Sequence, residues 1–316
     1  MITNESTVLI TGASGFLGRN LMEYLGNKGM KAIAVFRPSS NNWRFNDSKF
    51  NSITAELDDA EFWELYFSKT RITHILHLAT FGSYPNQTDP YVTVDTNLLK
   101  SLKFLEVALR CKTLVTFVSA GSASEYDPIT GKSAETDIGN PANIYGATKT
   151  AFGMVGSQLA KIHSKNFVHA RLFTMYGPWE DPNRIFPRLI THALIGKFPP
   201  MSNPSTARDF FYIDDALEFF YAVIKSNKSF NLPLNVGSGI STSLETLTNE
   251  IKTKFRLNVD PIWGEYPSRN FDQAEWTCTT DRALETFGWK SKITISDGIS
   301  RFTKWISDSN NKYYKT

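Results

Sequence analysis

The feature that most constrains this chain is a short apolar run followed by three evenly spaced glycines near its start. Val8–Thr11 has the pattern of a strand, and Gly12, Gly15 and Gly18 follow it, with helical spacing of apolar residues from Phe16 onward. Glycines at this spacing permit a tight turn, let the helix pack close to the strand and leave backbone N–H groups accessible at the helix N-terminus. The pattern favours a dinucleotide-binding βαβ unit over a plain strand–helix turn. The residues expected around the diphosphate are Gly12, Ser14, Gly15, Phe16, Leu17 and Gly18.

Apolar runs alternate with helical patterns through the first half of the chain. Such alternation is typical of an α/β Rossmann fold, in which helices cover a doubly wound parallel sheet. Helices are expected at about 92–110 and 144–163. The expected strands are Val8–Thr11, Ala32–Phe36, Ile53–Ala55, His74–Leu78, Thr113–Ser119 and Phe167–Leu172.

The pattern changes after Tyr176, where Pro and Asn become frequent up to about residue 208. A helix at 214–225 and a strand at 234–236 then indicate a return to the sheet. We therefore expect a dinucleotide-binding domain at 1–175 plus about 212–240. A smaller, discontinuous α/β substrate-binding domain is expected at about 176–211 and 241–316.

Bulk properties exclude several other classes of protein. A formal net charge of +3 over 316 residues is too small to indicate a nucleic-acid or anionic-membrane partner. No apolar stretch approaches the ~18 residues that span a bilayer. The two cysteines, Cys111 and Cys278, are too few for a disulfide framework. We expect a cytoplasmic protein, and the histidines lack the spacing of a metal site.

The end of the second expected strand indicates which dinucleotide fits. An acidic residue there would accept hydrogen bonds from a free ribose and repel a 2′-phosphate. This chain has Arg37 and Ser39 instead, which favours NADP(H), with NAD(H) possible. An ordinary surface arginine is the alternative for Arg37. Further cofactor candidates beyond the third and fourth strands are Leu57, Asp58 and Ala79.

A tyrosine and a lysine four residues apart predict a proton-transfer group. Tyr145 and Lys149 would lie on one helix face. A free phenol has a pKa near ~10, and a nearby ammonium together with an oxidised nicotinamide would lower it. Ser122, expected at the end of a strand, can polarise the same substrate oxygen. Tyr145 and Lys149 are therefore expected both to catalyse and to contact the cofactor.

These residues resemble the extended short-chain dehydrogenase/reductase family, in its nucleotide-sugar epimerase, dehydratase and reductase branch. The resemblance implies a Rossmann domain, a small C-terminal substrate domain and often a homodimer packed through two helices per subunit. The matching stretches span nearly the whole chain: 12–18, 77–79, Asn97, 119–126, 145–149, 171–178 and 208–215.

The resemblance also assigns substrate-binding candidates. Arg208 matches a position that contacts the substrate diphosphate, and Arg269, three residues before Asp272, matches a second. A local ion pair is the structural alternative for each arginine. Arg184 is a looser candidate, Thr80 is a candidate for the hexose, and Thr174 stands where many relatives carry Asn.

One departure from the family pattern argues against dehydration. Related 4,6-dehydratases carry an acid, a glutamate base or both directly after the catalytic serine or threonine, where this chain has Ala123 and Ser124. The nearest carboxylate, on Glu125, is shifted by one residue and is expected to point away.

The sequence leads to a hypothesis with two alternatives. The preferred function is reduction of a nucleoside-diphosphate-linked 4-keto-6-deoxyhexose, with NADPH as the hydride donor and Tyr145 as the proton donor. The close alternative is a 4-epimerase that retains NAD. The remote alternative is a Rossmann binding or sensor protein without turnover.

Overall fold

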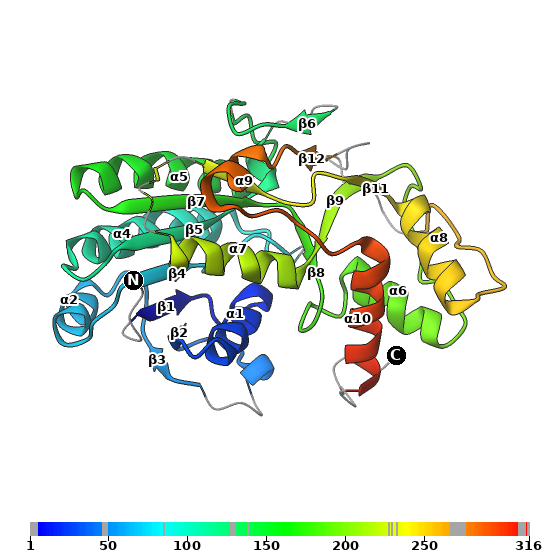
Figure 1. The fold of residues 1–316 in the computed structure, drawn as a ribbon, viewed down its shortest axis with the longest axis horizontal. Coiled ribbons are helices and arrows are strands. Elements are labelled where there is room, and N and C mark those ends of the chain that lie inside the picture. The colour runs from blue at the N-terminus through cyan, green and yellow to red at the C-terminus, as the bar shows by residue number, and fades with distance from the viewer. Residues whose placement is uncertain are drawn as a thin grey trace.

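Seven parallel strands form the central sheet of the computed structural model, which describes residues 6–45, 50–84, 86–126, 131–137, 139–226, 228, 230–231, 233–265, 276–308 and 314. Within these ranges the strand order is β10-β7-β5-β4-β1-β2-β3 (Figure 1). The expected Rossmann-like α/β fold is thus confirmed. In sheet order, the strands are β10 (Pro233–Val236), β7 (Asn166–Leu172), β5 (Thr116–Ser122), β4 (His74–His77), β1 (Thr7–Thr11), β2 (Lys31–Phe36) and β3 (Ser52–Thr54).

The first strand occupies the position where the direction of winding reverses. Thr11, at the end of β1, pairs with Val35 on one side and His77 on the other. Chain connections leave this point in opposite directions, which is where open α/β sheets bind ligands, at the carboxyl ends of the strands. This topology places the glycine turn beside the loops that follow β4 and β5.

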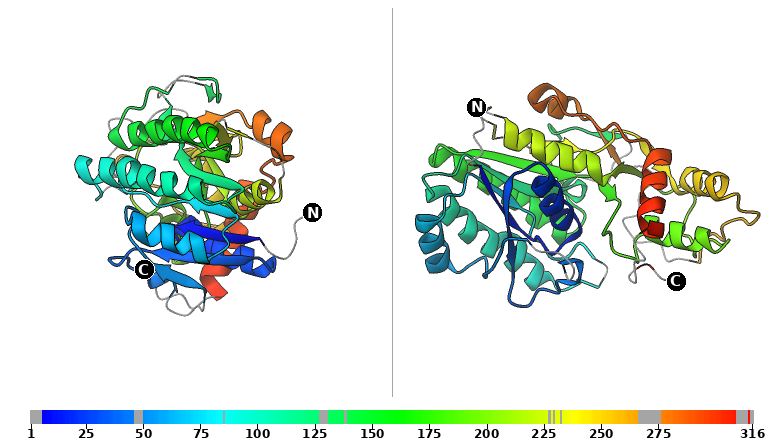
Figure 2. Two further views of the ribbon diagram at one scale, coloured as in Figure 1. Left: turned by 90° about the vertical axis from the view of Figure 1, so that its left-hand side faces the viewer. Right: turned by 60° about the horizontal axis from the view of Figure 1, so that its bottom comes forward.

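Helices cover both faces of the sheet, as Figure 2 (left) shows. One layer contains α2 (Ala60–Lys69), α4 (Ser101–Arg110) and α5 (Ile144–Ile162), and the other contains α1 (Phe16–Asn27), α7 (Ile213–Lys225) and α9 (Asp281–Phe287). Each layer closes its own apolar core, because a parallel sheet buried on both faces presents side chains to both. Trp63 and Phe104 lie in the first core, and Leu21 and Phe219 lie in the second.

Two expected elements differ in detail from the structure. The helix expected at 92–110 consists of α3 (Pro90–Val94), a π-helical segment η2 (Asp95–Lys100) and α4. The expected bounds of the fifth strand, Thr113–Ser119, are wrong. Residues 111–114 form a turn, in which Leu114 N donates to Cys111 O, and pairing with β7 continues as far as Ser122.

A second group of elements lies beyond the sheet, on the right in Figure 1. It contains a three-stranded sheet, with β9 between β8 and β11, and two helices flank α6. The division into two domains at the expected boundaries stays a prediction. The elements are β8 (Thr174–Tyr176), α6 (Ile185–Leu194), β9 (Ala207–Tyr212), β11 (Ser241–Ser243), α8 (Leu244–Phe255) and α10 (Ile295–Asp308), with the short pair β6 (Lys132–Ser133) and β12 (Thr277–Cys278) nearby.

A buried carboxylate fastens this second region to the loop that follows β10. Asp209 on β9 accepts hydrogen bonds from Ser238 N and Ser238 Oγ, each at 2.7 Å, and from Gly239 N at 2.8 Å. Thr277 Oγ1 adds a longer bond at 3.3 Å. Burial raises the pKa of Asp209, and these donors oppose the rise.

We expect Asp209→Ala to destabilise the fold by at least about 2 kcal/mol, because it leaves several buried donors without an acceptor. Urea unfolding measures the change. Asp214→Ala is the matched control, since Asp214 pairs with Arg301 at 3.1 Å on the surface, and an exposed pair contributes about 1 kcal/mol or less. Equal losses in the two variants would contradict the assignment.

Candidate active site

The three glycines of the turn differ in how closely the surrounding backbone packs on them. A Cβ on Gly12 would come within 2.6 Å of Ala79 N, and one on Gly18 within 2.6 Å of Ala13 Cα. A Cβ on Gly15 would meet only Gly12 O, at 3.2 Å. Gly15 is also the N-cap of α1 and provides no side-chain cap. Two glycines therefore serve packing, while Gly15 opens the helix N-terminus, and the residues present fit a dinucleotide.

The other cofactor candidates surround this turn. Arg37 and Ser39 are exposed just beyond β2, where Arg37 N donates to Ser40 Oγ at 3.0 Å. Ala79 N lies 3.4 Å from Thr11 Oγ1. Asp58 is 3.8 Å from Lys100 Nζ, so part of its charge is already paired. Leu57 is buried.

One arginine at this turn was missed by sequence reasoning. Arg44, in the 3₁₀ turn η1 (Trp43–Phe45), is buried and donates from Nη1 to Ser14 O at 3.2 Å and from Nε to Trp179 O at 2.8 Å. It thereby joins the glycine turn to the segment after β8. Nothing in the local pattern distinguishes it from a surface arginine.

Three expected residues meet at the carboxyl end of the sheet. Ser122 ends β5, Thr80 follows β4, and Tyr145 lies in the first turn of α5, which Asn143 caps by accepting from Gly146 N at 2.8 Å. Burial raises the pKa of Tyr145, while hydrogen bonds with the Ser122 and Thr80 hydroxyls oppose the rise. The protein's own groups thus keep the proton on Tyr145 at neutral pH.

Lys149 lies one turn further along the same helix. Its side chain is buried, and Nζ donates to Ala120 O at 2.9 Å and lies 5.8 Å from the centroid of the Tyr145 ring. Burial lowers the pKa of Lys149 to about 8, although the charge of Glu125 acts to raise it. Lys149 therefore remains mostly protonated at neutral pH.

The loop after β4 is fastened from two sides. Asn97, on the π-helical segment η2, accepts from Phe81 N at 2.8 Å and donates to Phe81 O at 2.9 Å. Arg184, the N-cap of α6, donates to Ser83 O at 2.9 Å and lies over the Tyr84 ring. Arg184 also lies close enough to Tyr145 to lower its pKa. The structure thus places Arg184 near the reacting end of the candidate site.

The remaining substrate candidates lie in the second group of elements. Thr174 is half-buried on β8, and Arg208 on β9 donates to Ala207 O at 2.9 Å with its guanidinium over Trp276. Arg269 and Asp272 lie outside the described residues. Their roles stay predictions.

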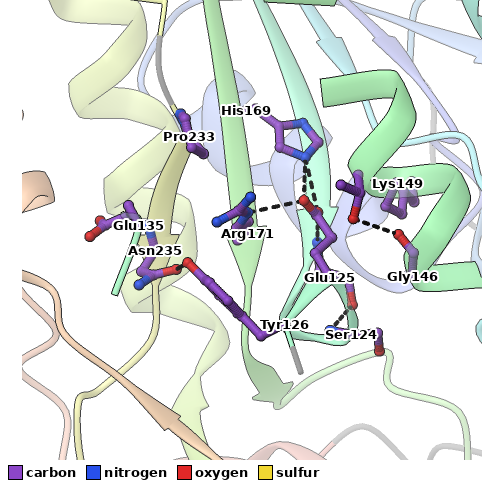
Figure 3. Close-up of polar contacts among 12 residues, drawn as sticks. Ser124, Glu125, Tyr126, Glu135, Gly146, Lys149, His169, Arg171, Pro233 and Asn235 are labelled. Atoms are coloured by element: carbon purple, nitrogen blue, oxygen red, sulfur yellow. Dashed lines mark hydrogen bonds and ion pairs between the residues drawn. The ribbon is translucent and has the colours of Figure 1, made fainter. Parts of the chain in front are cut away.

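Glu125 points away from the site, as expected. It lies in the 3₁₀ turn η3 (Ala123–Glu125), is fully buried and pairs with His169 and Arg171 on β7 (Figure 3). Burial alone would raise the pKa of Glu125, but His169, Arg171 and the Ser122 N–H more than offset this effect and lower the pKa. A buried, paired carboxylate does not supply the acid or base of a dehydratase.

Within the described part of the chain, no helix is both long and apolar enough to cross a membrane. No three His, Cys, Asp or Glu side chains in those ranges gather as metal ligands would.

We expect Gly15→Ala to lower dinucleotide affinity at least about tenfold, or ~1.4 kcal/mol, because its methyl group enters the open space at the helix N-terminus. Isothermal titration measures the affinity and a thermal melt measures the stability. Gly18→Ala is the contrast, since its methyl would collide with backbone and should lower the melting temperature. An unchanged affinity in Gly15→Ala would place the diphosphate elsewhere.

Comparisons with known proteins identify the family of this fold. The model of the NAD dependent epimerase/dehydratase family matches residues 8–237. UDP-glucuronate 4-epimerase 4 of Arabidopsis thaliana is 26% identical over 337 residues, covering 96% of this chain and 75% of that protein. CDP-abequose synthase of Salmonella typhimurium is 25% identical over 307 residues, covering 94% of this chain and 97% of that protein.

A solved structure gives the same picture of the fold. MoeE5 in complex with UDP-glucuronic acid and NAD superposes with a TM-score of 0.83 at 24% identity, covering 96% of this chain and 100% of that chain. At this identity the likeness shows a shared fold.

Proposed function

The chain belongs to the NAD dependent epimerase/dehydratase family, and from that premise we propose that it is a nucleotide-sugar 4-epimerase that retains NAD. Membership confirms the family resemblance and makes the protein an NAD-dependent enzyme. The observation that carries the proposal is the meeting of Ser122, Thr80 and Tyr145 beside the open glycine turn. This arrangement suits proton transfer at a sugar hydroxyl next to a bound dinucleotide.

A dinucleotide held at the glycine turn would supply reversible hydride transfer at C4 of the sugar, with return to the opposite face for inversion. With the oxidised cofactor bound, Tyr145 would act as the phenolate, take the proton of the C4 hydroxyl and give it back, while the Ser122 hydroxyl orients the same oxygen. The positive charge of Lys149, held by Ala120 O, favours the phenolate form of Tyr145 when the proton leaves. The positive charge of Arg184 acts in the same direction on the pKa of Tyr145.

The choice of 4-epimerisation rests on the relatives. Several relatives at similar identity are named UDP-glucuronate 4-epimerases, and their names support this reaction better than the reduction expected from the sequence. The cofactor is proposed to be NAD, because the family description and the MoeE5 complex both name NAD. The expected preference for NADP(H) finds no support in the comparisons.

Reduction of a 4-keto sugar with NADPH is the second candidate. It is favoured by the exposed Arg37 beyond β2, where NAD-specific folds place a carboxylate. The similarity to CDP-abequose synthase over nearly its full length keeps a CDP-linked sugar among the substrates to test. Ser122, Tyr145 and Lys149 would serve in this reaction as well, with Tyr145 as the proton donor.

Other parts of the proposal rest on the resemblance. Arg208, Arg269 and Thr174 are proposed to bind the substrate diphosphate, and Thr80 to face the hexose. A homodimer is proposed, for which exposed Tyr91 on α3 and exposed Val155 and Ile162 on α5 offer apolar surface. A cytoplasmic location stays a prediction from the low cysteine count.

The first test is to identify the dinucleotide released from freshly purified, denatured protein by mass spectrometry. The epimerase proposal expects about one NAD per chain, together with interconversion of C4 epimers of UDP-glucuronate or UDP-glucose without added reductant. Empty protein that consumes NADPH with a 4-keto sugar nucleotide would replace it with the reductase. Absence of turnover with every nucleotide sugar would contradict both.

Tyr145→Phe should lower kcat by at least about a thousandfold and leave dinucleotide affinity within about twofold, because it removes only the phenolic oxygen. Steady-state kinetics and isothermal titration measure the two quantities. Tyr126→Phe is the control, since it also removes one phenolic oxygen. The Tyr126 hydroxyl donates to Asn235 Oδ1 at 2.6 Å and makes no contact with Ser122 or Lys149 among the described hydrogen bonds. A Tyr145→Phe enzyme as active as the wild type would remove the catalytic assignment.

A further inference from the structure

A buried anion lies directly beneath the catalytic serine. The Glu125 side chain has 0% exposure, and its Oε1 accepts a hydrogen bond from Ser122 N at 2.8 Å. In return, Ser122 Oγ accepts from Ser124 N at 3.1 Å. These two bonds form a capping box at the end of β5.

The capping box holds the Ser122 Oγ in place. Because Oγ accepts from Ser124 N, its O–H remains available as a donor to Tyr145, whose pKa Ser122 lowers. Glu125 holds the backbone of the same residue. The orientation of the hydroxyl therefore depends on the position of a carboxylate that never reaches the substrate.

Glu125 is in turn held from β7. Its carboxylate pairs with His169 Nε2 at 2.9 Å and with Arg171 Nε at 3.0 Å, as Figure 3 shows. On its far side, His169 Nδ1 shares a hydrogen bond with Ser119 Oγ at 2.7 Å. The two bonds of the Glu125 carboxylate to β7 tie the loop to a central strand, so the carboxylate has little freedom to move.

The backbone around the pair has no room for side chains. A Cβ on Gly121 would come within 2.5 Å of Glu125 Oε1, and one on Gly153 would come within 2.6 Å of His169 Cδ2. Glycine at both positions, on β5 and on α5, lets the ion pair fit between strand and helix. The cluster is thus accommodated from two elements.

The charge of Glu125 also acts on the catalytic helix. It raises the pKa of Tyr145 and of Lys149. The charged and titratable groups around it are His169 and Arg171 on β7, Tyr145 and Lys149 on α5, and the adjacent Tyr126. A buried anion so close to both groups affects the proton transfer as well as the geometry.

We propose that Glu125 is a positioning residue, which aims the Ser122 hydroxyl at Tyr145 and balances the positive charge of Lys149. The proposal rests on the proposed function, since it assigns a role in the same proton transfer. It differs from a purely structural role, in which the ion pair would only stabilise the sheet.

The experiment is a double-mutant cycle of Glu125→Gln and Ser122→Ala, with kcat, KM and pH profiles. Glu125→Gln should lower kcat about tenfold or more with dinucleotide affinity unchanged. Because the Glu125 charge raises the pKa of Lys149, its loss should move the alkaline limb of the kcat profile, where Lys149 loses its proton, to lower pH. In the Ser122→Ala background the same change should lower kcat by a smaller factor than in the wild type, because the oriented hydroxyl is already gone and only the effect of the charge remains. Equal factors of kcat loss in the wild-type and Ser122→Ala backgrounds would overturn the proposal. A Glu125→Gln enzyme with wild-type kcat and pH profile would overturn it too.

Two further variants separate the effects of the charge and length of the residue-125 side chain from a loss of protein stability. Glu125→Asp keeps the charge but is too short to reach Ser122 N, so it should lower kcat while retaining the wild-type pH profile. Glu125→Asp also tests the proposal if the Glu125→Gln protein does not fold. Ser119→Ala removes only the bond on the far side of His169 and should lower the melting temperature with kcat within twofold. A tenfold loss of kcat in Ser119→Ala would point to a general structural effect.

A measurement that requires no turnover distinguishes the proposed function from the proposed role of Glu125. Ultraviolet titration of the Tyr145 phenol, taken as the difference from Tyr145→Phe proteins, should give a lower midpoint in Glu125→Gln than in the wild type. Inactive wild-type protein with this shift would contradict the proposed reaction alone. An unchanged midpoint would contradict the role of Glu125 whatever the reaction.

Discussion

The pairing of β1, β4 and β5 is the constraint on which the candidate site depends. Parallel pairing aligns the three strands, so Gly12, Thr80 and Ser122 follow strand ends at one edge of the sheet. Because the strands are buried on both faces, slippage by one residue would move apolar side chains out of one core and into the other. The two cores therefore hold the relative positions of the glycine turn and the catalytic loop.

Features carried by short-range patterns could be predicted from the sequence. Apolar runs gave most strands, and spacing placed Tyr145 and Lys149 on one helix. The fifth strand was misplaced because pairing with β7, which extends it to Ser122, is a long-range contact without a local signal. The same holds for Arg44, whose bonds to Ser14 O and Trp179 O join segments far apart in the chain. Burial and partners of individual charges follow from the fold, and a single sequence does not contain them.

The candidate site explains why one arrangement suits two reactions. Epimerisation and reduction both need a proton moved at C4 by Tyr145, with Ser122 holding the oxygen. The reactions differ in whether the dinucleotide stays and in how the sugar turns, and both depend on residues outside this cluster. Arg37 lies just beyond β2, at an exposed position. A local charge there biases cofactor choice without altering the catalytic groups, so cofactor preference and reaction type are separate questions.

The position of one carboxylate within a short loop decides which chemistry the loop supports. A carboxylate directly after Ser122 would follow the catalytic serine toward the sugar, as the resembling dehydratases require. At Glu125 the 3₁₀ turn η3 directs the side chain back under the strand, into contact with His169 and Arg171. A charge buried there is tolerated only because it is paired and hydrogen-bonded. The loop thereby holds a buried anion behind Ser122 in place of a carboxylate at the candidate site, which fits the proposed proton transfer through Tyr145.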